Sequence, residues 1–397
     1  MSTIELLAPA GDMEKLDVAL RFGADAIYLG GPMMQLRAAS TGFTLESLQT
    51  AIDTAHAMGR KLYVAVNAFA YNQDIDAAAA YARELADAGA DAAIVSDLGM
   101  LRACKRSAPD LDVHISTQAN CLNYESARTY HELGASRIVL GREMPIADIR
   151  TLRDRTPPEL ELEAFVHGSM CMAYSGRCMI SAHLNNRSAN RGGCTQSCRW
   201  RYALVEEKRP GQYMPVYEDD KGTAILSAFD LNMLAHLDAL INAGVTSMKI
   251  EGRMKTAYYV AIVTNAYRRA IDMSEPVEAL LAELDCVSHR PYSTGFYLGE
   301  PDTHSPAGDG YLQQCLFAAN VLEAAANGRV LIEQRNRIRE GDRLEVISPA
   351  LMGATFVASG IETEDGERIS SIDRPMQRVV IDCPYALVKG DMLRVRV

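Results

Sequence analysis

The stretch ELLAPAGDMEKLDVALRFGADAIYLGG (residues 5–31) contains the unit from which most of this chain is built. A short apolar run, Glu5–Leu7, precedes an amphipathic stretch, Met13–Phe22, then Gly23 and a second apolar run, Ala26–Leu29. Short runs rich in Val, Ile, Leu and Ala are typical of buried parallel strands, and a glycine after an amphipathic stretch is typical of a helix end. The stretch therefore predicts a strand, a helix and a second strand.

The same unit recurs as far as residue 255. Further strands are predicted at Lys61–Val66, Ala92–Val95, Val113–Ser116, Arg137–Leu140, Leu160–Val166 and Ser247–Ile250. Helices are predicted between them, as at Leu45–Met58 and Ile75–Ala88, and helix C-caps at Gly59, Gly89, Gly134 and Gly244. Eight strands alternating with helices over about 250 residues predict an α/β domain of the (β/α)8 TIM-barrel type. A doubly wound open sheet is the alternative, although no G-x-G-x-x-G follows the first run.

One connection is much longer than the others. Residues 169–246 separate two predicted strands, whereas connections in α/β units usually have about 2–6 residues outside the helix. We interpret 169–246 as a Cys-rich insertion within a barrel domain of residues 1–275. The insertion is expected to contain strands at Trp200–Val205, Tyr213–Tyr217 and Thr223–Ser227, a turn at 218–222 and a helix at Leu231–Asn242.

The pattern changes towards the C-terminus. The last barrel helix is expected at Tyr258–Met273, and residues 276–310, which contain Pro and Gly, are expected to cross to a second domain. Residues 311–397 combine short β-like runs with Gly-Asp turns and predict a small C-terminal all-β barrel. The runs are Cys315–Val321, Gly328–Ile332, Arg343–Ile347, Gln377–Ile381 and Met392–Val397.

The composition excludes several classes of protein. With 48% hydrophobic and 23% charged residues, the 397-residue chain is neither disordered nor collagen-like. It has no long apolar run and no N-terminal signal pattern, so no membrane span is expected and the expected location is cytoplasmic. A net charge of −11 excludes a generally basic nucleic-acid-binding surface but not a local basic patch.

Four of the nine cysteines lie within EAFVHGSMCMAYSGRCMISAHLNNRSANRGGCTQSCRWRY (residues 163–202). Six residues separate Cys171 from Cys178, fifteen separate Cys178 from Cys194, and three separate Cys194 from Cys198. Four thiolates from one segment can hold an iron–sulfur cluster or a zinc ion. Because the first pair is widely spaced, the spacing favours the cluster; zinc and unligated buried thiols are the alternatives.

The same segment has a local excess of positive charge. Residues 164–205 include five arginines and no acidic residue. Aromatic residues between the arginines could stack on unpaired bases, so the segment is a candidate RNA-binding surface. Equally, the arginines could balance the negative charge of a thiolate-ligated cluster. The candidate RNA-binding residues are Arg187, Arg191, Arg199, Trp200 and Arg201.

Polar residues follow many of the predicted strands, although turn residues and helix caps are common at such positions. The carboxyl ends of barrel strands converge on one mouth, where active sites lie. The set includes Gln118, Asn120, Arg142, His167, Glu251 and Arg253. We predict that His167 or Glu251 transfers protons, with a structural hydrogen bond as the alternative for each.

Three stretches, LLAPAGDMEKLDVALRFGADAIYLGG (residues 6–31), EAFVHGSMCMAYSGRC (163–178) and SMKIEGRMKTAYYV (247–260), resemble the peptidase U-32 (collagenase-like) family. The resemblance covers essentially the whole chain. RPGQYMPVYEDDKGTAILSAFDL (209–231) and HRPYSTGFYLG (289–299) are most similar to the branch of this family that forms 5-hydroxyuridine at the wobble position of tRNA. Membership of this branch implies O2-independent, prephenate-dependent hydroxylation, the first step toward the oxyacetic-acid or methoxy modification.

The resemblance also implies ligands and partners. Hydroxylating members carry a 4Fe-4S cluster on C-x6-C-x15-C-x3/4-C, which Cys171, Cys178, Cys194 and Cys198 match. Prephenate is a dicarboxylate, and the arginines predicted to hold it are Arg142, Arg253 and Arg37. Gln118 and Asn120 are further predicted substrate-binding residues. The implied macromolecular partner is the anticodon arm of tRNA, with the wobble base flipped outward.

The family contains other activities, which remain alternatives. One branch hydroxylates a cytidine of large-subunit ribosomal RNA, and some members act in pairs, so an accessory subunit beside a paralogous partner is possible. Proteolysis is the third alternative. The chain has no H-E-x-x-H or G-x-S-x-G motif, and a cysteine that ligates a cluster is not a free nucleophile.

Overall fold

The computed structural model describes residues 4–36, 42–171, 173–199, 217–219, 222–224, 229–299, 311–325 and 327–397. The chain divides into two compact units. The first unit comprises Met1–Leu20, Ala24–Lys255 and His289–Tyr311. The second comprises Arg21–Gly23, Thr256–Ser288 and Leu312–Val397.

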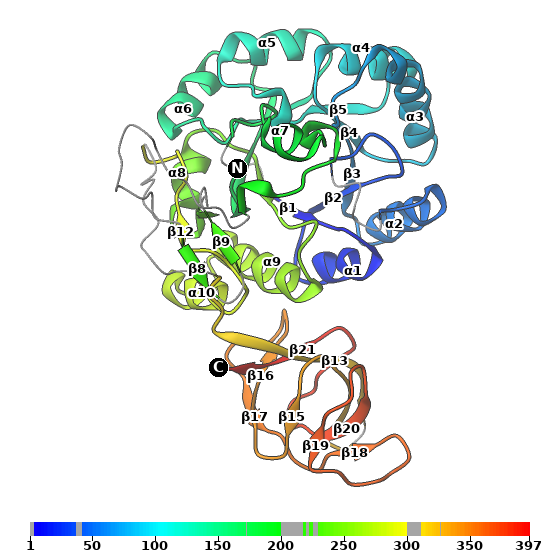
Figure 1. Cartoon of the computed structure of the whole chain (residues 1–397), viewed down its shortest axis with the longest axis vertical. Coiled ribbons are helices and arrows are strands. Elements are labelled where there is room, and N and C mark those ends of the chain that lie inside the picture. The colour runs from blue at the N-terminus through cyan, green and yellow to red at the C-terminus, as the bar shows by residue number, and fades with distance from the viewer. Residues whose placement is uncertain are drawn as a thin grey trace. The chain divides into compact units, whose positions relative to one another are not determined.

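In the described part of the first unit, eight parallel strands close into a barrel, because β11 pairs with both β1 and β7. The strands are β1 (Glu5–Pro9), β2 (Ala26–Gly30), β3 (Lys61–Val66), β4 (Ala92–Val95), β5 (Asp112–Ile115), β6 (Arg137–Val139), β7 (Glu161–Ser169) and β11 (Ser247–Ile250). Figure 1 shows them at the centre of a ring of helices. The predicted TIM-barrel-like fold is confirmed, and closure excludes the open sheet.

Helices connect the strands, and local sequence sets their ends. They are α1 (Met13–Arg21), α2 (Leu45–Ala57), α3 (Ile75–Asp87), α4 (Leu98–Ser107), α5 (Tyr124–Glu132), α6 (Ile146–Asp154), α8 (Leu237–Asn242) and, after β11, α9 (Ala257–Ile271). Side chains of Thr44, Asp97, Asn123 and Thr256 accept a hydrogen bond from the backbone three residues on and so cap α2, α4, α5 and α9. The glycines predicted as C-caps, at positions 23, 59, 89, 134 and 244, all have positive φ, as that role requires.

The insertion lies between β7 and β11. It contains α7 (Ile180–Asn185), the hairpin of β8 (Tyr217–Asp219) and β9 (Gly222–Ala224), β10 (Asp230–Asn232), and the 3-10 turns η3 (Ala189–Arg191), η4 (Ser197–Arg199) and η5 (Leu234–His236). Further 3-10 turns follow β3 at η1 (Asn72–Asp74) and β5 at η2 (Thr117–Ala119). β12 (Tyr292–Ser293) pairs with β10.

Two expectations for the insertion are wrong in part. The helix predicted at Leu231–Asn242 begins only at Leu237, because Asp230–Asn232 pairs with the extended end of β7. Residues 218, 219 and 222, expected in a turn, belong to the hairpin strands. The strand predicted at Trp200–Val205, and residues 213–216 of the next, lie outside the described residues.

The second unit combines α9 and α10 (Val277–Leu284) with antiparallel strands. Its main sheet has the order β17-β16-β21-β13-β14-β20-β18, and β15 pairs with β19. The strands are β13 (Cys315–Ala325), β14 (Arg329–Gln334), β15 (Ile338–Arg339), β16 (Arg343–Ile347), β17 (Thr355–Val357), β18 (Glu362–Thr363), β19 (Ser371–Ile372), β20 (Arg378–Asp382) and β21 (Met392–Arg396). Alternating Val, Ile and Leu side chains form its core, which confirms the all-β character predicted for the C-terminal part. No described helix is long and apolar enough to cross a membrane.

Candidate functional site

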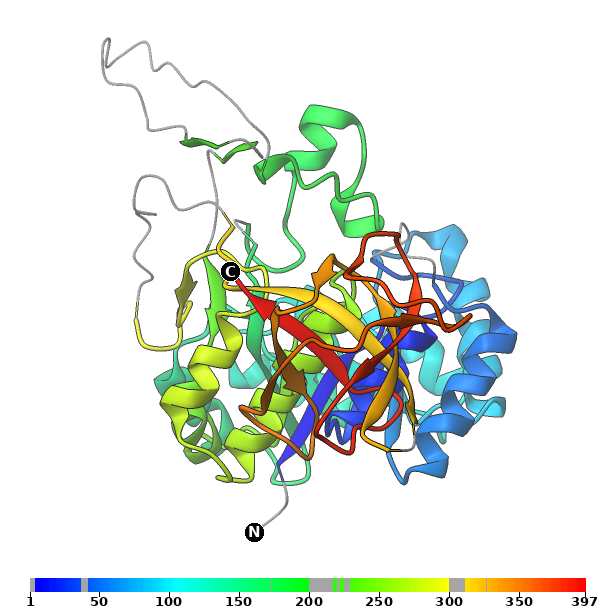
Figure 2. The same cartoon turned by 90° about the horizontal axis from the view of Figure 1, so that it is seen from below.

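A cavity of about 370 Å³ lies at the carboxyl ends of the barrel strands. Its walls come from the segments that follow β3, β5, β6, β7 and β11, and from the insertion. Figures 1 and 2 show α7, which belongs to the insertion, over this end of the barrel. The strand ends and the cysteine segment, which the sequence singled out separately, therefore form one site.

All four predicted ligand cysteines line this cavity. Cys171 and Cys194 are exposed, Cys178 and Cys198 are half-buried, and none is in a disulfide. Among the described residues, no three His, Cys, Asp or Glu side chains lie close enough together to hold a single metal ion. Four thiols that are not in disulfides nevertheless line one cavity, and thiolates are the donors that an iron–sulfur cluster uses, so the chemistry of these residues fits such a group.

The loop that joins Cys171 to Cys178, here called the cysteine loop, is in close contact with the barrel. Gly176 has a φ of +72°, and a Cβ atom there would lie 2.0 Å from the carbonyl oxygen of Gln118. The carboxylate of Glu143 accepts hydrogen bonds from the backbone N–H (2.8 Å) and the hydroxyl (3.2 Å) of Ser175. Only a glycine lets the two backbones approach this closely, so position 176 fixes the loop that joins Cys171 to Cys178.

Arg191 ties the next part of the insertion to the segment after β3. Its guanidinium donates to the carbonyl of Phe69 (2.6 Å) and to the carboxylate of Asp74 (2.9 Å), and lies 4.3 Å from the ring centre of Tyr71. The hydrogen bond from Arg191 lowers the pKa of Asp74. Arg191, predicted to contact RNA, thus has partners within the chain.

Arg187 is the other predicted RNA-binding residue whose side chain the structure describes. Arg187 is exposed on the insertion. Tyr174 and Leu184 from the same segment are also exposed, at 61% and 48% of their surfaces. The side chain of Arg199, together with Trp200 and Arg201, lies outside the described residues.

Positive side chains outnumber negative ones around the cavity. The positive side chains that line it are Arg142, Lys249, Arg253 and Lys255, and the acidic ones are Glu143 and Glu251. Arg142 donates to the carbonyl of Ser169 (2.9 Å), lies 4.0 Å from the ring centre of Phe165 and is 3.9 Å from the Glu251 carboxylate. An excess of fixed positive charge in a partly closed pocket favours an anionic ligand.

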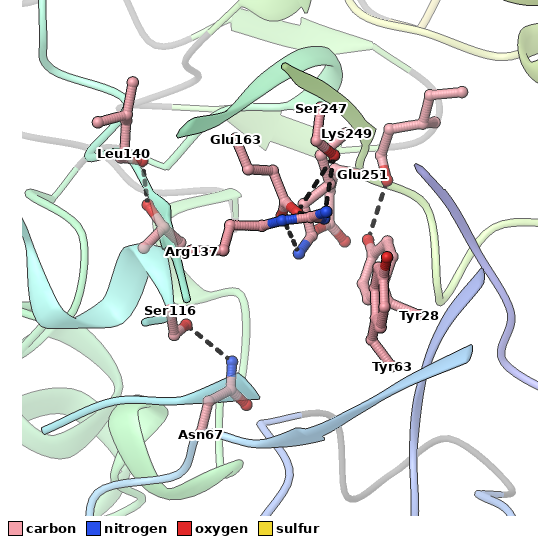
Figure 3. Close-up of polar contacts among 12 residues, drawn as sticks. Tyr28, Tyr63, Asn67, Ser116, Arg137, Leu140, Glu163, Ser247, Lys249 and Glu251 are labelled. Atoms are coloured by element: carbon pink, nitrogen blue, oxygen red, sulfur yellow. Dashed lines mark hydrogen bonds and ion pairs between the residues drawn. The ribbon is translucent and has the colours of Figure 1, made fainter. Parts of the chain in front are cut away.

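Lys249 is a cavity residue that sequence reasoning missed. It is 4% exposed, donates to the Glu163 carboxylate at 2.7 Å, and its ammonium lies 4.3 Å from the ring centre of Tyr28. Burial lowers the pKa of Lys249, and the carboxylate opposes that effect. Figure 3 shows Lys249 and Arg137 converging on Glu163. The available signal was a lysine inside the apolar run SMKI (247–250).

Some of the remaining predicted site residues line the cavity, and others lie outside its lining. Gln118 and Glu251 line the cavity, whereas His167 and Asn120 do not. His167 is 1% exposed on β7, and burial lowers its pKa to about 3. Asn120 donates to the Glu143 carboxylate at 3.3 Å. Arg37 lies outside the described residues.

The fold and the site define a parallel (β/α)8 barrel whose mouth is covered by a four-cysteine insertion. The chain belongs to Peptidase family U32: the family model matches residues 11–306, and the model of the U32 C-terminal domain matches residues 313–394.

Three curated relatives show which proteins this chain resembles. It is 35% identical to "tRNA hydroxylation protein P1" of Bacillus subtilis, over 98% of this chain and 94% of the relative. It is 33% identical to "tRNA hydroxylation protein P" of Escherichia coli, over 91% and 90%. It is 37% identical to the E. coli "23S rRNA 5-hydroxycytidine C2501 synthase", over 68% of this chain and 39% of that protein.

Proposed function

We propose that this chain hydroxylates C5 of the wobble uridine of tRNA, independently of O2, with a 4Fe-4S cluster and prephenate as co-substrate. The observation that carries the proposal is that all four spaced cysteines line the same cavity as Arg142 and Arg253. The two relatives that match nearly the whole chain are named as tRNA hydroxylation proteins, which supports tRNA as the substrate. A tRNA substrate also supports a cytoplasmic location.

Cys171, Cys178, Cys194 and Cys198 are the proposed cluster ligands. C5 of uridine is electron-rich and is not attacked by water, so oxygen insertion needs a redox centre or an oxidised oxygen donor. The cluster, when bound, supplies one-electron chemistry beside the substrate. The chain's own residues hold the loop that carries the ligands, through the close contact of Gly176 with Gln118.

Arg142 and Arg253 are proposed to bind the two carboxylates of prephenate. Arg142 is held against Phe165 and the carbonyl of Ser169, and Arg253 donates to the side-chain oxygen of Gln35 at 3.3 Å. Both guanidinium groups are therefore oriented before a ligand arrives, which favours charge-assisted hydrogen bonds to carboxylates. Glu251, 3.9 Å from Arg142, is better placed than buried His167 to exchange a proton in the cavity.

The prephenate site is tested by kinetics of substitutions at Arg142. Arg142→Ala should lower kcat/KM for prephenate by roughly 10- to 100-fold, because one charge-assisted hydrogen bond is lost. Arg150→Ala removes an exposed arginine of α6 and serves as the control. Wild-type kinetics in both Arg142→Ala and Arg253→Ala would refute prephenate binding at this site.

The proposed reaction is tested by nucleoside mass spectrometry of tRNA and ribosomal RNA from a strain that lacks the gene and any paralogue. Complementation with the wild-type chain should restore 5-hydroxyuridine derivatives in tRNA, and Cys171→Ala should not. Restoration of a hydroxycytidine in ribosomal RNA instead would make ribosomal RNA the substrate. If neither RNA changes, RNA hydroxylation is wrong and proteolysis or an accessory role replaces it.

A further inference from the structure

Two buried thiols of the second unit, outside the cavity, are in direct contact. Cys286 and Cys315 are both 0% exposed, and their sulfur atoms lie 2.9 Å apart. A disulfide bond is about 2.05 Å long, so the two sulfur atoms need to approach by less than about 1 Å to become bonded. Neither cysteine has a part in the proposed RNA chemistry.

The backbone holds the two cysteines in register. Cys286 follows the C-terminus of α10, and Cys315 is the first residue of β13. Their chain neighbours are hydrogen-bonded, since the N–H of Gln314 donates to the carbonyl of Asp285 at 3.1 Å. The carbonyl of Cys286 accepts a hydrogen bond from the hydroxyl of Tyr258 at 3.1 Å.

Side chains around the pair fix α10 against the sheet. Arg394 on β21, the strand beside β13, donates to both carboxylate oxygens of Glu283 on α10, at 2.8 and 2.6 Å. The ring of Tyr258 stacks on Phe317 of β13, with ring centres 5.1 Å apart. The contact between the two sulfur atoms is thus set by a bidentate ion pair, a stacked ring pair and a backbone hydrogen bond.

We propose that Cys286 and Cys315 form an intramolecular disulfide bond when the protein is oxidised by hydrogen peroxide. The hydrogen bond between the two sulfur atoms lowers the pKa of Cys315, as does the positive charge of Arg394, while burial opposes both. The thiolate of Cys315 attacks the peroxide, which leaves a sulfenic acid and releases one water after protonation. The thiol of Cys286 then displaces the second water as the S–S bond forms; overall, two thiols lose two protons and two electrons, and peroxide becomes two waters.

The disulfide bond would close the loop formed by the residues between Cys286 and Cys315. Of the residues between the two cysteines, 289–299 and 311 belong to the first unit, whereas both cysteines belong to the second. A disulfide here would link the point where the chain leaves the second unit to the point where it returns. Closure of such a loop should raise the unfolding midpoint of the second unit by roughly 5–10 °C.

The site is tested by peptide mapping of the full chain after incubation with hydrogen peroxide, with free thiols alkylated under denaturing conditions. The expected product is a linked peptide pair that contains Cys286 and Cys315 and separates on reduction. Oxidation should also raise the unfolding midpoint of the wild type but not of Cys315→Ala. Cys383→Ala, which removes a buried cysteine of the same unit, is the matched control and should keep the shift.

Full alkylation of both cysteines after peroxide treatment of the wild type would overturn the proposal. So would linkage of either cysteine to a different partner. Because the mapping uses the wild-type chain, these outcomes decide the question even if Cys315→Ala does not fold.

Discussion

At the scale of single residues, His167 has the clearest electrostatic consequence. Burial lowers its pKa to about 3 from an ordinary value of 6.5, against the opposing effect of Asp230. Between these two pH values the unfolded chain binds a proton that the folded chain does not, so the free energy of unfolding falls as the pH falls. His167 should account for a loss of roughly 2 kcal/mol between about pH 7.5 and pH 5.

This prediction is checked by urea unfolding of the wild type and His167→Gln across that pH range. The substitution should flatten the fall in stability at acidic pH, since glutamine does not titrate. His183→Gln, at an exposed position on α7, should leave the slope as it is in the wild type. A wild-type slope in His167→Gln would mean that His167 is not held neutral by burial.

At the scale of elements, the cysteine loop depends on one glycine. Gly176→Ala places a methyl group 2.0 Å from the carbonyl oxygen of Gln118 in η2, in addition to the strain of a positive φ. Limited proteolysis within residues 173–199 should become roughly tenfold faster, because the loop must lift from the barrel. Gly59→Ala has a similar φ but no atom within 4 Å, so it measures the strain alone. Equal effects of the two substitutions would show that the contact with Gln118 does not hold the loop.

The surroundings of the arginines on the insertion predict how tRNA binding depends on salt concentration. Arg187 is exposed, whereas Arg191 is bound to Phe69 and Asp74, so Arg187 is the better test of phosphate contact. Arg187→Glu should weaken tRNA binding and reduce the slope of log Kd against log salt by about 1. Arg102→Glu, at an exposed position of α4, is the control. An unchanged slope in Arg187→Glu would exclude a phosphate contact by this residue.

The barrel strands could be predicted from the sequence, but the long-range contacts of polar residues inside the barrel domain could not. Strand positions followed from short apolar runs, because buried parallel strands have no polar face. Leu231 and Asn232 were predicted as the start of a helix, because the pairing of Asp230–Asn232 with β7 is a long-range contact that local periodicity does not contain. Arg137 and Glu163, inside apolar runs, are buried as an ion pair of 2.9 Å. Their partners come from separate strands, so the sequence could not pair them.

The candidate site could be predicted only in part, because some of its features are local in the sequence and others depend on long-range contacts. The spacing of four cysteines is a local signal, and the convergence of strand ends follows from barrel geometry. Their union in one cavity depends on how the insertion folds back over the mouth, through contacts such as Arg191 with Phe69. The roles of these residues in catalysis remain predictions.

For the molecule as a whole, we propose that this single chain, with its cysteine-lined cavity, hydroxylates tRNA. The most direct test incubates the anaerobically purified chain with unmodified tRNA and prephenate and measures 5-hydroxyuridine by mass spectrometry. We expect product that requires prephenate, is lost in Cys171→Ser and persists in Cys104→Ser, which changes a buried cysteine of α4. Absence of product from iron-loaded wild-type chain, or equal product from Cys171→Ser, would contradict the claim.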